Sequence, residues 1–291
     1  MPLLNKWWYT EYAEEIVITL REREVKRTPF YQQSPQFKYR SILVAWMRSI
    51  AEDLHLNNAA IHLAVYLLDI FMDNHRIEEE RLNFVALVCI LLAAKTEERD
   101  ANVPKISELN TRVGNQYPAT DFISLEFMVM HFFHWNLVIP TAAHFAEYFT
   151  VFATSLSDMN SAPPQFNTYP DLRNAVQQYI RDFLDLSLQE VCLIPMKPSF
   201  VAAVCIAAAR QFLHMSPKWP DVLENVTMYQ YKDLQPCVML FISKADREVA
   251  CGNKRKLTES PDHGYVTEDS VTNSPEVSND KRSSKRSRTC S

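Results

Sequence analysis

The amino-acid sequence predicts an all-α protein of two tandem helical bundles, and three observations lead to this fold class. First, the 291 residues include only three glycines, whereas a hairpin-rich β fold needs many turns with positive φ. Second, residues 84–94 and 200–209 are uninterrupted apolar runs, which is typical of helices buried on every face. Third, each run follows two segments with helical periodicity, so the second half repeats the plan of the first.

An N-terminal helix and connector, residues 1–36, precede the first bundle, which we assign to residues 37–139. Apolar residues at helical spacing predict a surface helix over residues 7–26. The central apolar run has eleven residues, well short of the roughly 20 that a membrane span requires. It therefore predicts a buried helix of a soluble domain. The five helices predicted for the first bundle are residues 37–54, 57–74, 82–98, 104–109 and 121–135.

The second bundle is assigned to residues 140–248. Residues 135–140 form a short extended link, because the residue before a proline avoids the α region, and Thr141 is a suitable N-cap for the next helix. From Gly252 the sequence becomes rich in charged and small polar residues, so we expect residues 249–291 to be a disordered tail. The helices predicted for the second bundle are residues 141–153, 171–188, 200–209 and 233–247.

The composition excludes several classes of function. So few glycines rule out the glycine-dependent phosphate loop and the dinucleotide fingerprint. The six cysteines show no CxxC spacing, which favours free thiols in a reducing compartment. The first 251 residues contain 22 Lys and Arg against 29 Asp and Glu, and such an acidic body speaks against direct nucleic-acid binding. The N-terminus lacks the pattern of a signal peptide, which predicts a cytoplasmic or nuclear protein.

Four charged residues stand alone in apolar helical segments, where each needs a partner. Arg40 and Asp69 lie on neighbouring predicted helices, and we interpret them as a buried structural ion pair. Lys95 and Glu126 leave three alternatives open. They pair with each other, they extend to solvent, or they contact a partner protein.

Five motifs resemble the cyclin family, and the resemblance covers about residues 9–247 in the order of that family. It implies two tandem five-helix cyclin boxes. It also implies a non-enzymatic regulatory subunit that binds and activates a cyclin-dependent serine/threonine protein kinase in cell-cycle control. The alternative is a cyclin-fold scaffold or transcription-associated adaptor that activates no kinase. The motifs are EEIVITLREREVK (14–26), YRSILVAW (39–46), IHLAVYLLDIF (61–71), LLAAKTEE (91–98) and WNLVIPTAAHF (135–145).

The resemblance assigns roles to particular residues. It implies that Arg40 and Asp69 form a structural pair, and that Lys95 and Glu126, together with Glu98, face the kinase. It also implies a docking patch for substrates or inhibitors that contain an Arg-x-Leu (RxL) sequence. From the residues alone, the same side chains are the inner face of a helix. The patch consists of Tyr39, Ile42, Leu43, Trp46 and Asn83.

The sequence departs from the family's pattern at positions that bear on these roles. Tyr39 replaces a usual methionine, and Ser49 stands where several cyclins carry the acid that receives the docking arginine. Thr96 replaces the aromatic residue that usually follows the kinase-facing lysine. We therefore expect weak or altered docking and a kinase contact of altered shape.

No arrangement of side chains indicates catalysis, a cofactor or a metal site. His131 and His134 have helical spacing but no third ligand joins them, so structural histidines are the preferred interpretation. We therefore predict a protein that is not an enzyme and that acts by binding other proteins.

The tail contains two basic clusters that suit nuclear import through an import receptor, although a solubilising charge run has the same composition. We predict a nuclear protein that also occurs in the cytoplasm. Ser260 and Ser274 each precede a proline and are candidates for phosphorylation by proline-directed kinases. The basic residues are Lys254, Arg255, Lys256, Lys281, Arg282, Lys285 and Arg286.

Overall fold

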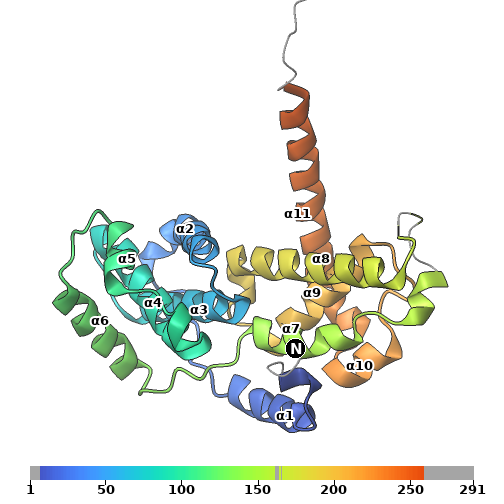
Figure 1. The fold of residues 1–291 in the computed structure, drawn as a ribbon, viewed down its shortest axis with the longest axis horizontal. Coiled ribbons are helices and arrows are strands. Elements are labelled where there is room, and N and C mark those ends of the chain that lie inside the picture. The colour runs from blue at the N-terminus through green and yellow to red at the C-terminus, as the bar shows by residue number, and fades with distance from the viewer. Residues whose placement is uncertain (1–6, 161–163, 165, 259–291) are drawn as a thin grey trace, which may run out of the picture. The chain divides into compact units, whose positions relative to one another are not determined.

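The computed structural model describes residues 7–160, 164 and 166–258. Within these residues all regular secondary structure is helical, which confirms the predicted fold class. None of the described helices is both long and apolar enough to cross a membrane. Residues 1–248 form one compact unit and residues 249–291 belong to another. The first unit contains two helical bundles (Figure 1).

The first bundle has five helices around a buried central one. They are α2 (Arg40–Asp53), α3 (Asn58–Asn74), α4 (Leu82–Glu97), α5 (Ile106–Thr111) and α6 (Ala119–Phe132). Every residue of α4 from Phe84 to Ala94 is buried, and α2, α3 and α6 pack around it. The side chain of Asn57 caps α3 by accepting a hydrogen bond from the Ala60 amide at 2.7 Å.

The second bundle repeats this plan with α9 at its centre. Its helices are α7 (Ala142–Phe149), α8 (Tyr169–Gln189), α9 (Pro198–Phe212), α10 (Asp221–Thr227) and α11 (Tyr231–Thr258). Every residue of α9 from Val201 to Arg210 is buried, as its apolar run predicted. Thr141 begins α7 in a capping box with His144, so the predicted N-cap is confirmed.

Two features of the second bundle differ from the sequence prediction. α10 is the fifth helix that the resemblance to two five-helix boxes implies, but helical periodicity did not locate it; Pro220 stands just before its first turn, where a proline costs a helix no hydrogen bond. α11 continues to Thr258 instead of ending near residue 247. Its last turns are rich in Lys and Arg, which favour helix, and a single glycine costs only about 1 kcal/mol. Residues 259–291 of the predicted disordered tail lie outside the described residues.

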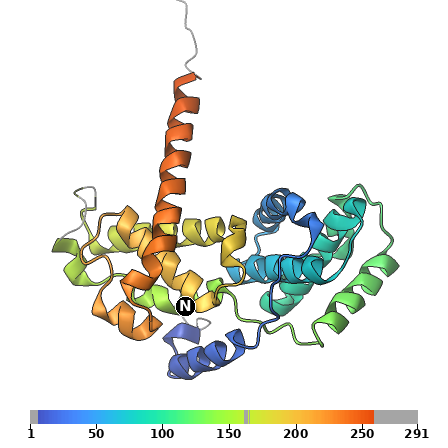
Figure 2. The same ribbon diagram turned by 180° about the vertical axis from the view of Figure 1, so that it is seen from behind.

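The N-terminal helix α1 (Ala13–Glu24) packs against the second bundle although it precedes the first bundle in the chain. Figure 2 shows it from behind, beside the helices of the second half. Val17 on α1 is part of the second hydrophobic core. Arg21 donates a hydrogen bond to the Thr227 carbonyl at 2.7 Å, where it meets the C-terminal end of α10. The N-terminal helix is therefore an integral part of the second bundle.

The last residue of α1, Glu24, anchors this helix to the central helix of the second bundle. Its carboxylate is buried and accepts hydrogen bonds from the Ser199 amide at 3.0 Å and the Ser199 hydroxyl at 2.8 Å. Ser199 lies in the first turn of α9, where free amides and the helix dipole favour a negative charge. The carboxylate thus caps a helix that begins more than 170 residues later in the chain.

A buried arginine also holds together the loops of the second bundle. Arg210 is fully buried, and its guanidinium contacts the Asp158 carboxylate at 2.8 Å. It also donates to the carbonyls of Ala153 at 2.6 Å and Pro217 at 2.7 Å. The pair was not predicted, because Asp158 lies in a loop far from any apolar run. Each bundle therefore contains one buried Arg–Asp pair, since Arg40 and Asp69 occupy the first.

We predict that Glu24→Ala lowers the free energy of unfolding by about 2–3 kcal/mol, because it removes two charge-assisted hydrogen bonds and leaves the start of α9 without its acceptor. Glu22 is exposed on the same helix, so Glu22→Ala is the matched control and should change stability by less than about 0.5 kcal/mol. Urea unfolding of both variants measures the difference. Equal stability of the two variants would contradict the capping role.

Candidate partner-binding surface

The helix α6 has an apolar face that the bundle does not cover. Only Phe122 and Val129 of this helix are buried. In contrast, Ile123 and Phe127 are each 58% exposed and Met128 is 53% exposed. Large apolar side chains gathered on one exposed helix face mark a site for another protein.

Trp135, just after α6, extends this apolar surface. Its indole is 55% exposed and meets the Phe127 ring edge to face, with ring centroids 5.4 Å apart. The backbone of Trp135 has φ of 60°, a left-handed conformation that bulky residues rarely adopt. Local strain of this kind is concentrated at functional sites. We call the surface formed by Ile123, Phe127, Met128 and Trp135 the α6 face.

Lys95 and Glu126 lie beside the α6 face and pair with each other. The Lys95 ammonium is 2.5 Å from the Glu126 carboxylate. The Lys95 side chain is 45% exposed and the Glu126 side chain is 14% exposed. Of the three alternatives that the sequence left open, the structure shows the mutual pair.

Glu98, the third residue that the resemblance placed against a kinase, is engaged within the bundle. Its carboxylate accepts a hydrogen bond from the Asn57 amide at 2.5 Å, just before α3 begins. Thr96 donates back to the Leu92 carbonyl at 2.9 Å, so the residue that replaces an aromatic ring in the family satisfies its own hydroxyl. Both side chains therefore already have a hydrogen-bond partner within the bundle.

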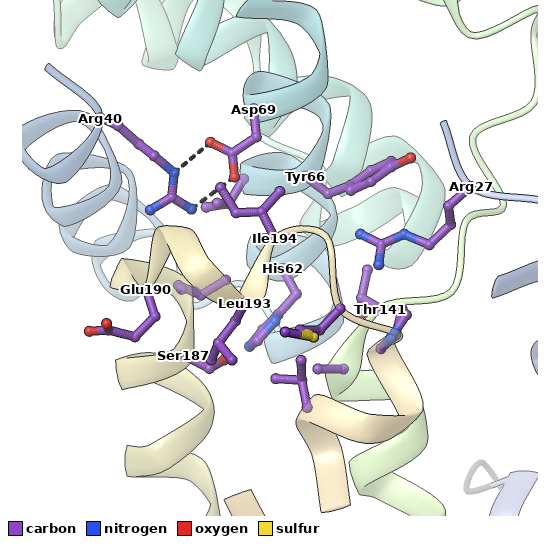
Figure 3. A pocket seen from close by; sticks show the side chains of 16 residues that line it. Arg27, Arg40, His62, Tyr66, Asp69, Thr141, Ser187, Glu190, Leu193 and Ile194 are labelled. Atoms are coloured by element: carbon purple, nitrogen blue, oxygen red, sulfur yellow. Dashed lines mark hydrogen bonds and ion pairs between the residues drawn. The ribbon is translucent and has the colours of Figure 1, made fainter. Parts of the chain in front are cut away.

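Arg40 and Asp69 form a bidentate pair between α2 and α3, as Figure 3 shows. The Arg40 Nε and Nη2 atoms donate to the two carboxylate oxygens at 2.7 and 2.8 Å, and both side chains are 3% exposed. A cavity of about 70 Å³ lies beside the pair and is also lined by Arg27 and His62. The geometry is that of a structural pair.

His62 is buried beside this cavity, and burial changes its protonation. Loss of hydration lowers the pKa of His62 from 6.5 to about 3, with smaller contributions from the nearby His144 and Arg48 charges. The imidazole is therefore neutral at physiological pH, and its Nε2 atom has no partner among the described residues.

The residues of the docking patch are only partly at the surface. Ile42 is 72% exposed and Asn83 is exposed, whereas Tyr39 and Trp46 are half-buried. Leu43 is 4% exposed and belongs to the first hydrophobic core, so its assignment to a contact surface is wrong. It points inward because it lies on the side of α2 that packs against the bundle, together with Val44 and Met47.

The remaining predicted sites are described only in part. His131 stacks against Phe127 with ring centroids 6.3 Å apart, and no group of metal-binding side chains occurs among the described residues. Residues 254–256 lie in the last turns of α11. The second basic cluster and both candidate phosphorylation sites, Ser260 and Ser274, lie outside the described residues. Nuclear import and phosphorylation stay predictions.

Comparison with known proteins assigns the chain to a family. Residues 15–138 match the family described as "Cyclin, N-terminal domain", and residues 140–266 match "Cyclin, C-terminal domain". Cyclin-J of Xenopus laevis is 35% identical over 261 residues, which cover 88% of this chain and 68% of that protein. The chain belongs to the cyclin family.

Other cyclins show the same relationship. Human Cyclin-J is 33% identical over 272 residues, covering 92% of this chain and 70% of that protein. Among solved structures, a viral cyclin from Herpesvirus saimiri superposes with a TM-score of 0.59 at 18% identity, covering 79% of this chain and 97% of that chain. A chain of the CAK complex from Chaetomium thermophilum superposes with a TM-score of 0.53 at 14% identity, covering 85% of this chain and 75% of that chain. These likenesses support the tandem cyclin fold.

We predict that Asp69→Ala destabilises this cyclin by about 3–5 kcal/mol, because Arg40 is then left buried without its counter-charge. Asp53 pairs with Arg112 at the surface, so Asp53→Ala is the matched control and should cost less than about 1 kcal/mol. Chemical unfolding distinguishes the two. Similar losses in both variants would mean that the Arg40–Asp69 pair is hydrated.

We also predict that His62 makes stability fall in mild acid. Between pH 6.5 and about 3 the unfolded chain binds a proton at this position that the folded chain does not, so stability decreases as the pH falls through this window. The loss reaches about 2 kcal/mol at pH 5. The test is urea unfolding at pH 7 and pH 5 for the wild type and for His62→Gln. The variant should lose less stability than the wild type, and an equal loss in both would refute the prediction.

Proposed function

We propose that this cyclin is a regulatory subunit that binds a cyclin-dependent serine/threonine protein kinase and stabilises its active conformation. The observation that carries the proposal is the α6 face, an apolar surface on a helix that packs on α4 with only two of its side chains buried. Lys95 and Glu126 adjoin it with both charges in reach of a partner. Such an apolar centre beside polar groups is the composition of a specific protein interface.

The size of the α6 face suits the energy that activation requires. Reversing an equilibrium between inactive and active kinase from 1:99 to 99:1 takes about 5.5 kcal/mol of differential binding. At about 25 cal/mol per Å², this corresponds to burial of roughly 220 Å² of apolar surface that only the active form covers. Phe127 and Trp135 each expose more than half of their surface, and aromatic side chains bury about 150–250 Å² each when fully covered. Two such rings supply an area of that order.

The charge pair adds specificity at little cost in stability. The Lys95 side chain is 45% exposed, so solvent partly screens its pair with Glu126, and a partner that offers backbone hydrogen bonds to both groups replaces the pair. The charges then fix the orientation of a contact whose affinity comes from the apolar side chains. Glu98 accepts a hydrogen bond from Asn57 within the bundle, and its contact with a kinase stays part of the proposal.

We propose in addition that peptides with an Arg-x-Leu sequence dock beside α2 through Ile42, Trp46 and Asn83. The acid usually present in the family is replaced by Ser49, but Glu79 offers a carboxylate next to Tyr39, whose hydroxyl donates to it. That hydrogen bond, with the nearby Lys38, lowers the pKa of Glu79. The carboxylate is therefore ionised and suited to a peptide arginine. Entry into the nucleus through the basic clusters is part of the proposal and rests on the sequence alone.

We predict that Phe127→Ala, and separately Lys95→Ala, weaken kinase association by about tenfold or more, because each removes a central contact of the interface. Both positions are substantially exposed, so the thermal midpoint should change little. Lys105→Ala, at an exposed lysine outside the α6 face, is the control. The measurement is co-purification with a panel of cell-cycle cyclin-dependent kinases, followed by phosphorylation of a histone substrate.

The same experiment separates kinase activation from the alternative, a cyclin-fold adaptor. An adaptor would leave the kinase activity of every tested partner unchanged. Binding that is insensitive to both substitutions would place the interface away from the α6 face. A kinase that binds through this face and gains activity supports the proposed function.

A further inference from the structure

A second concave site lies where the end of α1 meets the linker between the two bundles. The pocket has a volume of about 290 Å³. Three basic residues from the end of α1, Arg23, Lys26 and Arg27, line it together with His134 and Asn136 of the linker, and no described carboxylate side chain does. We propose that this pocket binds the phosphoryl group of a phosphorylated protein segment.

The three cations of the pocket form no ion pair with a described carboxylate. The charges of Glu24 and Asp69 act on Arg27 only from beyond ion-pair distance. Glu24, which stands between the cations in the sequence, is buried and accepts hydrogen bonds from Ser199 of α9. Because Glu24 caps α9, the one acidic side chain of residues 23–27 does not line the pocket. The pocket is therefore positively charged, although the protein as a whole is acidic.

Arg27 is held in place and has an unused donor. Its guanidinium lies over the Tyr66 ring, 4.1 Å from the ring centroid. The Nε atom is buried and has no hydrogen-bond partner among the described residues. Burial lowers the pKa of Arg27 below its ordinary value, which reflects the cost of a cation in poor contact with water. An anion in the pocket supplies the missing acceptor and a counter-charge at closer range than Glu24 and Asp69.

The shape and lining favour a phosphorylated protein segment. Arginine side chains bind phosphate oxygens with particular strength. The Arg23 Nη1 atom already reaches the Val138 carbonyl at 3.5 Å, so the cations converge from α1 onto the linker. Phe132, Val138 and Pro140 also line the pocket and offer apolar surface for a residue next to the phosphoryl group. A nucleic acid needs phosphate contacts along an extended basic surface, whereas here the cations are confined to about one helical turn.

The test uses the isolated full-length chain and fluorescence anisotropy, with three labelled probes: a short phosphothreonine peptide flanked by leucines, its unphosphorylated counterpart, and a single-stranded oligonucleotide. The variant is Arg23→Gln combined with Lys26→Gln, two exposed positions whose change leaves the half-buried Arg27 in place. Lys105→Gln is the control for loss of one exposed positive charge. Thermal unfolding verifies that each variant is folded.

We expect the phosphopeptide to bind at least about tenfold more tightly than its unphosphorylated counterpart, and inorganic phosphate to compete with it. The double variant should lose this preference and the control should keep it. Equal affinity for the two peptides would overturn the proposal, as would a preference that survives in the double variant. Tighter binding of the oligonucleotide that depends on the same two residues would assign the pocket to nucleic acid instead. No kinase is needed, so the result is independent of the proposed kinase-binding function.

Discussion

The fold depends on arginine side chains that are buried and paired with aspartates. Arg40 links α2 to α3 through Asp69. Arg210 links the central helix of the second bundle to two loops, one through the Asp158 carboxylate and the other through the Pro217 carbonyl. A buried guanidinium is tolerated only when its counter-charge is correctly placed. These contacts therefore select one arrangement of helices in each bundle, whereas the apolar cores alone would accept several packings. The candidate binding surfaces lie on the two bundles that these pairs hold in place.

Much of this frame could be predicted from the sequence because it follows from local pattern. The runs around Phe84 and Val201 allow no exposed helical face, so the two central helices could be identified without any knowledge of tertiary contacts. Arg40 and Asp69 were paired for a similar reason, since each stood alone in an apolar segment. In contrast, Asp158 lies among Ser, Asn and Pro residues, and nothing local indicates that a distant arginine needs it.

The candidate site was harder to predict, because an apolar residue type does not reveal which way a side chain faces. Residues 121–135 are as apolar as many core helices, yet several of their large side chains lie at the surface, and only the packing of α6 on α4 decides which ones. Leu43 shows the opposite error, since its motif suggested a contact surface and packing makes it part of the core. The unused donor of Arg27 is also a product of tertiary structure, because it depends on the direction in which Glu24 turns.

The position of α1 determines the order in which parts of the protein can fold during synthesis. This helix leaves the ribosome before either bundle, and Ser199, which hydrogen-bonds to its terminal carboxylate, is synthesised about 175 residues later. Domains fold as units during synthesis at about 5–20 residues per second. The first bundle is therefore synthesised before the core against which the apolar side of α1 packs. At these speeds the delay is roughly ten seconds or more. During this interval the nascent chain exposes the apolar residues of α1 to chaperones.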